Sequence, residues 1–171
     1  MRIKDEQPND TKRISRIQYA AFKGHPQHKP GAEPVEHRIV ERLRETNALS
    51  LSLLAEDEGN TVGHIAFSPA SVGKASQGWY LLGPVGVLPD RQGKGIGSAL
   101  VREALKRLRA QGALGVVLVG DPAFYERFGF TSRPRLTYPG VPDQYVLALA
   151  FTDKTPEGDI IAHDAFAVAD E

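Results

Sequence analysis

Hydrophobic residues recur at helical spacing in three stretches of this chain, and they predict three amphipathic helices. The first covers residues 10–23 and the second covers 34–47, with a loop rich in proline and glycine at 24–33 between them. The third helix is longer, at 95–111, and Gly112 is placed to end it in a left-handed conformation. The hydrophobic residues that define the first two helices are Ile14, Ile17, Ala20, Ala21, Val35, Ile39, Val40 and Leu43.

Alternating or continuous hydrophobic runs predict strands in much of the remaining chain. Residues 56–60 are predicted as a hairpin turn, and residues 69–78 as a connection made of small residues. In the tail, residues 152–171, the segment 159–162 can add an edge strand. The predicted strands are 48–55, 61–68, 79–88, 114–119, 130–133 and 144–151. This mixture of helices and strands predicts an α/β protein with a mixed sheet.

The predicted strand at 79–88 contains three residues that fit poorly into a regular ladder, namely Gly83, Pro84 and Gly86. Proline donates no backbone hydrogen bond, and glycine has no side chain to pack. We therefore expect a bulge or a splay of the sheet at this point. Backbone groups freed in this way can pair with an extended ligand.

A glycine-rich turn follows this strand and opens the long helix. Glycines 93, 95 and 97 let backbone N–H groups approach a ligand without obstruction by side chains. The first turn of the helix contains no acidic residue to complement the positive end of its dipole. The pattern indicates a site for a phosphate or pyrophosphate.

Two familiar phosphate-binding motifs fit this turn poorly. In the nucleoside-triphosphatase loop a Ser or Thr follows the lysine, whereas here Lys94 is followed by Gly95. The dinucleotide fingerprint has the spacing Gly-x-Gly-x-x-Gly, whereas this turn has Gly-x-Gly-x-Gly.

A different motif does fit. The run Gln92-Gly93-Lys94-Gly95-Ile96-Gly97 resembles the acetyl-coenzyme A motif of the GNAT N-acetyltransferase superfamily, in a bacterial branch of it. A second segment, Tyr125-Glu126-Arg127-Phe128-Gly129-Phe130, matches the Tyr-x-x-x-Gly-Phe that ends a short helix in that superfamily. The two motifs also stand in the family's order and separation. Asp121 departs from the pattern, because the family usually has Asn at the head of this short helix.

The resemblance implies a fold, a domain organisation and an activity. The implied fold is a mixed, mostly antiparallel sheet of about six to seven strands, with a splay between two parallel strands and about four flanking helices. Residues 1–171 would form a single N-acetyltransferase domain with its core at 1–151. The implied reaction is direct transfer of an acetyl group from acetyl-coenzyme A to a primary amine in a ternary complex.

The resemblance also implies which residues bind the coenzyme. Lys94 either approaches the pyrophosphate or is a solvated loop lysine. Asp121 stands where the family usually has an Asn that forms a hydrogen bond to the coenzyme arm. The implied coenzyme-binding residues are Val85, Val87, Gln92, Gly93, Lys94, Gly95, Ile96, Gly97, Ser98, Asp121 and Tyr125.

Two catalytic roles follow from the same resemblance. The backbone N–H of Val87 faces the thioester carbonyl in the family, where it stabilises the oxyanion. Tyr125 matches the tyrosine that donates a proton to the departing sulfur, and a phenol with a pKa near 10 is neutral at working pH. The structural alternative for Tyr125 is a core tyrosine on a short helix.

The general base is less well defined by the sequence, which offers Glu33, Glu36 and His64 as candidates. An imidazole with a pKa of about 6.5 can accept a proton directly or through water. A hydrogen-bonded structural histidine is the alternative for His64, and a solvated helix face is the alternative for Glu36. An acceptor amine of low pKa would need no dedicated base.

Composition narrows the remaining possibilities. The 21 basic and 21 acidic residues balance, so no general attraction to nucleic acid or to anionic membranes is expected. There is no cysteine, which excludes an acyl-enzyme through sulfur. His25 and His28 alone are a weak metal motif, and we expect no metal cofactor. No apolar run reaches the length of a membrane span, so a cytoplasmic location is expected.

The expected partner is a small-molecule or peptide amine, and a homodimer stays open. A non-catalytic acyl-coenzyme A binding or sensing module of the same fold is the main alternative to an enzyme. A third alternative is an interaction protein in which the glycines serve only a tight turn.

Overall fold

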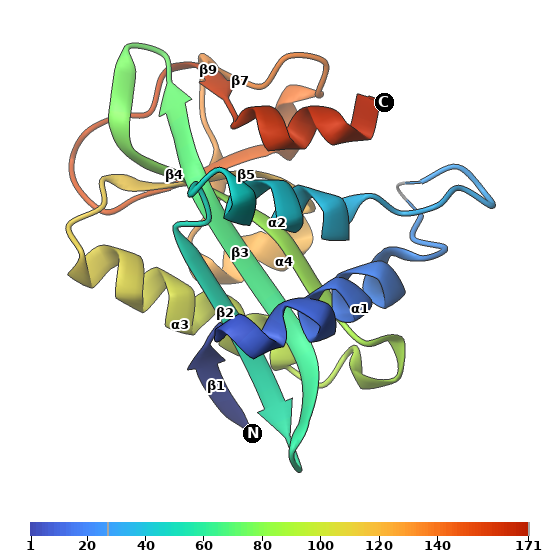
Figure 1. Cartoon of the computed structure of the whole chain (residues 1–171). Helices are drawn as coiled ribbons and strands as arrows, with labels where there is room; N and C mark the ends of the chain where they lie inside the picture. The colour runs from blue at the N-terminus through green and yellow to red at the C-terminus, as the bar shows by residue number, and fades with distance from the viewer. Residues whose placement is uncertain (27, 171) are drawn as a thin grey trace.

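A computed structural model describes residues 1–26 and 28–170 of the chain (Figure 1). Four α-helices lie within these residues: α1 (Thr11–Phe22), α2 (Glu36–Glu45), α3 (Ile96–Ala110) and α4 (Pro122–Tyr125). The strands are β1 (Arg2–Asp5), β2 (Leu51–Asp57), β3 (Asn60–Val72), β4 (Ala75–Val87), β5 (Gly115–Val119), β6 (Thr131–Ser132), β7 (Leu136–Thr137), β8 (Val146–Ala150) and β9 (Gly158–Ile161).

The strands form one twisted, mixed sheet in the order β1-β2-β3-β4-β5-β8-β6. Neighbouring strands in this path are antiparallel except β4 and β5, which run parallel. β9 pairs with the end of β3 and with β7. The predicted fold class is confirmed: a mostly antiparallel sheet with one parallel pair at its centre, flanked by helices.

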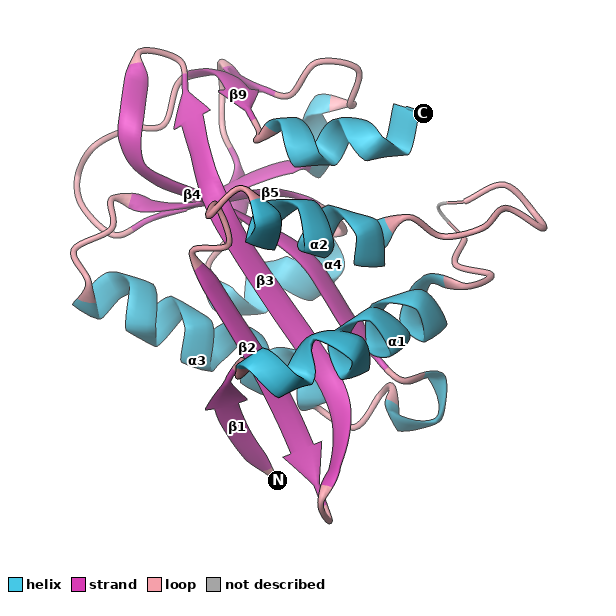
Figure 2. Ribbon diagram, in the orientation of Figure 1, coloured by secondary structure: helices cyan, strands magenta, loops and turns pink. Residues whose placement is uncertain are grey.

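Helices cover both faces of the sheet, with α1 and α2 on one face and α3 and α4 on the other (Figure 2). Successive side chains of a strand point to opposite faces, so a strand covered on both sides must be apolar at consecutive positions. Leu53 and Leu54 are both fully buried for this reason. Leu54 packs in the cluster of Ile14 and Val40 beneath α1 and α2, whereas Leu53 packs in the large core that includes α3.

The predicted connection at 69–78 is wrong. Most of these residues belong to strands, because β3 and β4 form one long hairpin that turns at Gly73. Val72 pairs with Ala75 across the turn and with Ile160 on its other side. Small side chains resemble a loop in the sequence, but here they continue a ladder that is supported from the tail of the chain.

The two ends of the chain add elements that the local pattern did not specify. β1 pairs along the outer edge of β2 and was not predicted. The edge strand expected at 159–162 is present as β9. After it, residues 164–170 form a 3₁₀ helix whose Ala165 and Val168 pack against Ile39 and Leu43 of α2. The tail therefore packs against α2.

The predicted irregularity in β4 lies where Gly83 and Pro84 occur. Val85 pairs with Ile65, and Leu82 pairs with Phe67. Gly83 and Pro84 therefore lie opposite the single residue Ala66 on β3. On the other side, pairing of β4 with β5 ends at Leu81, opposite Val117, within the described residues. Beyond this point the two parallel strands diverge, and the space between them is where the site lies.

Candidate functional site

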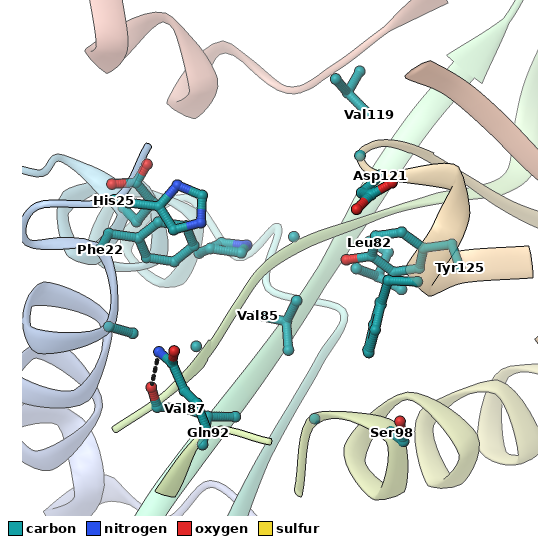
Figure 3. A pocket seen from close by; sticks show the side chains of 18 of the residues that line it. Phe22, His25, Leu82, Val85, Val87, Gln92, Ser98, Val119, Asp121 and Tyr125 are labelled. Carbon is teal, nitrogen blue, oxygen red and sulfur yellow. Dashed lines mark hydrogen bonds between the residues drawn. The ribbon is translucent and has the colours of Figure 1, made fainter. Parts of the chain in front are cut away.

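A cavity of about 870 Å³ lies where β4 and β5 separate. We call one part of it the loop end, which is lined by residues 91–93 and 95–98 and by 120, 121, 124, 125 and 127. We call the other part the aromatic end, lined by Phe22, His25, Glu36, Ile39, Tyr138 and Phe166. Figure 3 shows Phe22 and His25 on one side of the cavity, Asp121 and Tyr125 on the other, and Val85 between them.

The glycine-rich turn has the conformation that its sequence predicts. Gly93 and Gly95 have φ angles of +76° and +84°, which side chains rarely tolerate, and no atom lies within 4 Å of a Cβ added at either position. Gly95 is the N-cap of α3, and no side chain caps the helix. The first N–H groups of α3 therefore have neither an intrahelical partner nor a capping side chain. They border the cavity at Ile96, Gly97 and Ser98.

The end of β4 directs one residue's backbone toward the same space. The N–H of Leu88 donates to the Val62 carbonyl on β3, with an N···O distance of 2.9 Å. Consecutive residues of a strand direct their backbone groups to opposite sides. The backbone of Val87 therefore points away from β3, and its carbonyl accepts a hydrogen bond from Gln92 Nε2 at 3.0 Å.

The short helix α4 brings Asp121 and Tyr125 to the opposite side of the cavity. Asp121 Oδ1 accepts a hydrogen bond from the N–H of Ala123 at 2.9 Å, so this carboxylate caps the helix. Tyr125 is only 9% exposed and packs edge-on against Phe124 and Phe130. Burial raises the pKa of the Tyr125 phenol to about 12, so it carries its proton at neutral pH.

The charged residues at the loop end differ from those expected. Lys94 is exposed and does not line the cavity, whereas Arg91 and Arg127 do. The Arg127 guanidinium stacks over the Phe124 ring at 4.6 Å, and its Nε donates to the Phe124 carbonyl at 2.8 Å. Sequence reasoning missed Arg127, although it stands inside the Tyr-x-x-x-Gly-Phe motif. Arg91 also pairs with Asp57 at 3.1 Å.

The fold does not bring His64 to the cavity. His64 is fully buried under α1, with Gln18 Nε2 at 2.7 Å from Nδ1 and Ser52 Oγ at 2.8 Å from Nε2. Ser52 donates in turn to Glu6, at 2.8 Å. Burial, and to a lesser degree Arg44, lowers the pKa of His64 to about 3 despite the opposing effect of Glu6. The geometry is that of a neutral structural histidine.

Of the two glutamates considered as the general base, one lies away from the cavity and the other lines it. Glu33 lies on the surface, its side chain 67% exposed, where it binds Lys23 at 2.6 Å and also accepts from the Tyr19 hydroxyl. The hydrogen bond from Lys23, and then that from Tyr19, lowers the pKa of Glu33. Glu36 instead lines the cavity and is only 7% exposed.

One of the two histidines of the α1–α2 connection, His28, pairs with Glu36. His28 Nε2 lies 3.1 Å from both carboxylate oxygens of Glu36, and the Phe22 ring packs against His25 and His28. The sequence did not reveal this acidic partner, because eight positions separate it from His28. Within residues 1–26 and 28–170 no three His, Asp or Glu side chains converge as metal ligands would.

In the described part of the chain, every helix is too short or too polar to span a bilayer.

Comparisons with known proteins agree with this geometry. Residues 12–130 match the sequence model of the acetyltransferase (GNAT) family. A GNAT family acetyltransferase from Brucella melitensis, crystallised in complex with acetyl-CoA, is 45% identical with a TM-score of 0.83. That match covers 96% of this chain and 97% of the Brucella chain.

Two matches involve YhbS from Escherichia coli. Its crystal structure in complex with CoA is 30% identical with a TM-score of 0.84, covering 96% of this chain and 91% of the YhbS chain. In sequence, the uncharacterized N-acetyltransferase YhbS of strain K12 is 42% identical over 96 residues, which is 56% of this chain. The match spans only 58% of that curated relative's length. The family match and the two structures together establish that this chain belongs to the GNAT acetyltransferase family.

Proposed function

We propose that this protein is an acetyl-CoA-dependent N-acetyltransferase that acetylates a primary amine by direct attack within a ternary complex. The observation that carries the proposal is the continuous cavity, which joins the uncapped N-terminus of α3 to the divergence of β4 and β5. The Brucella and E. coli relatives that were crystallised with acetyl-CoA or CoA support it.

In this proposal the loop end holds the coenzyme. The backbone amides between Gln92 and Ser98 bind the diphosphate, because a helix N-terminus favours a negative group. The pantetheine arm extends along β4 past Val85 and Val87, where no strand pairs with the cavity side of β4 in the described residues. Arg127 borders the same space and supplies a positive charge to a coenzyme phosphate.

The chemistry requires three events at the thioester. The nitrogen lone pair of the neutral amine attacks the carbonyl carbon, and the oxyanion that forms accepts a hydrogen bond from the Val87 N–H. The carbon–sulfur bond then breaks, and the Tyr125 phenol donates its proton to the departing thiolate. Solvent returns a proton to the phenolate.

The attacking nitrogen must also lose a proton. Once it has attacked, the nitrogen is positively charged and far more acidic than a free alkylammonium, so a carboxylate can accept its proton. Of the three candidates from the sequence, Glu36 is the one that lines the cavity, and we assign it this role.

Calorimetry and a thiol-release assay test the proposal together. Acetyl-CoA should bind, and at about a hundred times its dissociation constant it should stabilise the fold by about 2.7 kcal/mol. A panel of primary amines with acetyl-CoA should release free CoA thiol, and the background should be low because the chain has no cysteine. Binding without turnover of any amine would indicate a sensing module, and absence of binding would contradict a coenzyme site altogether.

A further inference from the structure

The aromatic end of the cavity has a composition that restricts the amine it can accept. Four of its residues present apolar surface and come from separate parts of the chain: Phe22 from the end of α1, Ile39 from α2, Tyr138 after β7, and Phe166 from the C-terminal 3₁₀ helix. Ile39 and Phe166 belong to one packed cluster, so the tail closes this wall. Such a wall favours a ligand with an apolar or aromatic body.

Within this apolar wall lies one carboxylate, that of Glu36. It accepts a hydrogen bond from the Val35 N–H at 3.2 Å, and His28 Nε2 lies 3.1 Å from each of its oxygens. A carboxylate offers about four lone-pair sites, so it can accept from several donors at once.

Positive charge is distributed in the opposite way. Among the described residues that line the cavity, the only arginines are Arg91 and Arg127, and both lie at the loop end. No lysine is among the described residues that line the cavity. An acceptor that carries its own carboxylate would therefore place a negative charge beside Glu36, in an environment of low polarity and at the other end of the cavity from these two arginines.

We propose that the acceptor is a primary amine with a compact apolar or aromatic body and no carboxylate, and that Glu36 binds its ammonium group. This inference rests on the proposed function and specifies its substrate class. Alkyl amines are cations at neutral pH, so the form that meets the enzyme is the ammonium, which releases one proton to solvent before its nitrogen attacks. Glu36 attracts that group, while Phe22, Ile39 and Phe166 receive the body. Recognition itself makes and breaks no covalent bond.

Two amines that differ in a single group test the substrate class. 2-Phenylethylamine and phenylalanine share a phenyl ring and a primary amine, but only phenylalanine has a carboxylate. With acetyl-CoA and the thiol-release assay, kcat/KM for 2-phenylethylamine should exceed that for phenylalanine by about tenfold or more. Spermidine, which carries additional cations and no apolar ring, should also be the poorer substrate.

The variant Glu36→Gln tests the role of the carboxylate, because it keeps the size and an acceptor for the Val35 N–H. Its ratio of kcat/KM for 2-phenylethylamine to that for phenylalanine should fall by about tenfold, since a neutral amide no longer repels the second carboxylate. A merely structural disturbance would lower both rates and leave the ratio unchanged. Glu33→Gln is the matched control on the same segment, and it should keep the wild-type ratio.

The outcomes separate this inference from the proposed function. The acceptor class is wrong if kcat/KM for phenylalanine or for spermidine equals that for 2-phenylethylamine. It is also wrong if Glu36→Gln keeps the wild-type ratio. In either case the acetyltransferase proposal stands. If acetyl-CoA binds and none of the three amines is acetylated, the inference is also overturned. If calorimetry detects no binding of acetyl-CoA, the proposed function itself fails.

Discussion

The side chain of Gln92 donates a hydrogen bond from Nε2 to the carbonyl oxygen of Val87, at 3.0 Å. This contact ties the start of the glycine-rich turn to the last residue of β4. It therefore couples the phosphate-binding part of the proposed coenzyme site to the strand whose N–H we assign to the oxyanion. Gln92 itself is exposed, so its contribution to overall stability should be small.

Replacing this side chain should loosen the turn. In Gln92→Ala we expect the affinity for acetyl-CoA, measured by calorimetry, to fall about five- to tenfold, as for loss of one hydrogen bond. Thermal unfolding should remain close to the wild type. Gln111→Ala removes another exposed glutamine, beyond the other end of α3, and should change neither quantity. An unaltered affinity in Gln92→Ala would contradict the role given to this contact.

Gly97 tests whether the N-terminus of α3 receives the diphosphate. A Cβ at this position has no neighbour nearer than 3.8 Å, so a side chain would project into the cavity without disturbing the core. Gly97→Leu should weaken acetyl-CoA binding by about a hundredfold while the free energy of unfolding changes by less than about 1 kcal/mol. Ala110→Leu, which adds similar bulk at the exposed end of the same helix, should bind normally.

Tyr125→Phe tests the proton donor. Because the pKa of this phenol is about 12, tyrosine stays protonated throughout the neutral range and the variant removes only the hydroxyl. We expect kcat to fall about a hundredfold with little change in the dissociation constant of acetyl-CoA. Equal losses in turnover and in coenzyme binding would instead indicate that Tyr125 serves to pack the short helix.

His64 should affect stability rather than catalysis. The unfolded chain protonates this imidazole below about pH 6.5, whereas the folded protein keeps it neutral down to about pH 3. Stability from this group is therefore lost as the pH falls from about 6.5 toward 3, and the unfolded state binds more protons over that range. From this group alone, the free energy of unfolding should be about 1.4 kcal/mol lower at pH 5.5 than at pH 7.5.

Urea unfolding of the wild type and of His64→Gln at these two pH values measures the effect. The variant should lose most of the difference between the two conditions, whatever its absolute stability. A difference of the same size in both proteins would assign the pH dependence to other groups.

Local sequence signals specified the two segments that border the loop end of the cavity. The turn at residues 92–98 and the motif at 125–130 depend on backbone conformations that glycine permits and on contacts between near neighbours in the chain. Hydrophobic periodicity located the main helices, because it too is a pattern among near neighbours in the chain. The long β3–β4 hairpin was missed at residues 69–78, because its continuation depends on pairing with β9 from the tail.

The candidate bases illustrate the limit of local reasoning. Glu33, Glu36 and His64 are comparable in the sequence, but only Glu36 lines the cavity. His64 is held by hydrogen bonds to Gln18 and Ser52, which lie 46 and 12 positions away in the chain. Gln18 reaches His64 only because α1 packs over the sheet, and Ser52 reaches it only because β2 pairs with β3.

The amino-acid sequence by itself determined the glycine-rich turn, the uncapped start of α3 and the irregular strand before it, since each of these follows from the backbone preferences of a few consecutive residues. The tertiary structure alone decided which side chains line the cavity. That outcome depends on the divergence of β4 from β5 and on the packing of the C-terminal helix against α2. Both are contacts between segments far apart in the chain, whose free energy is gained only when the whole sheet is assembled.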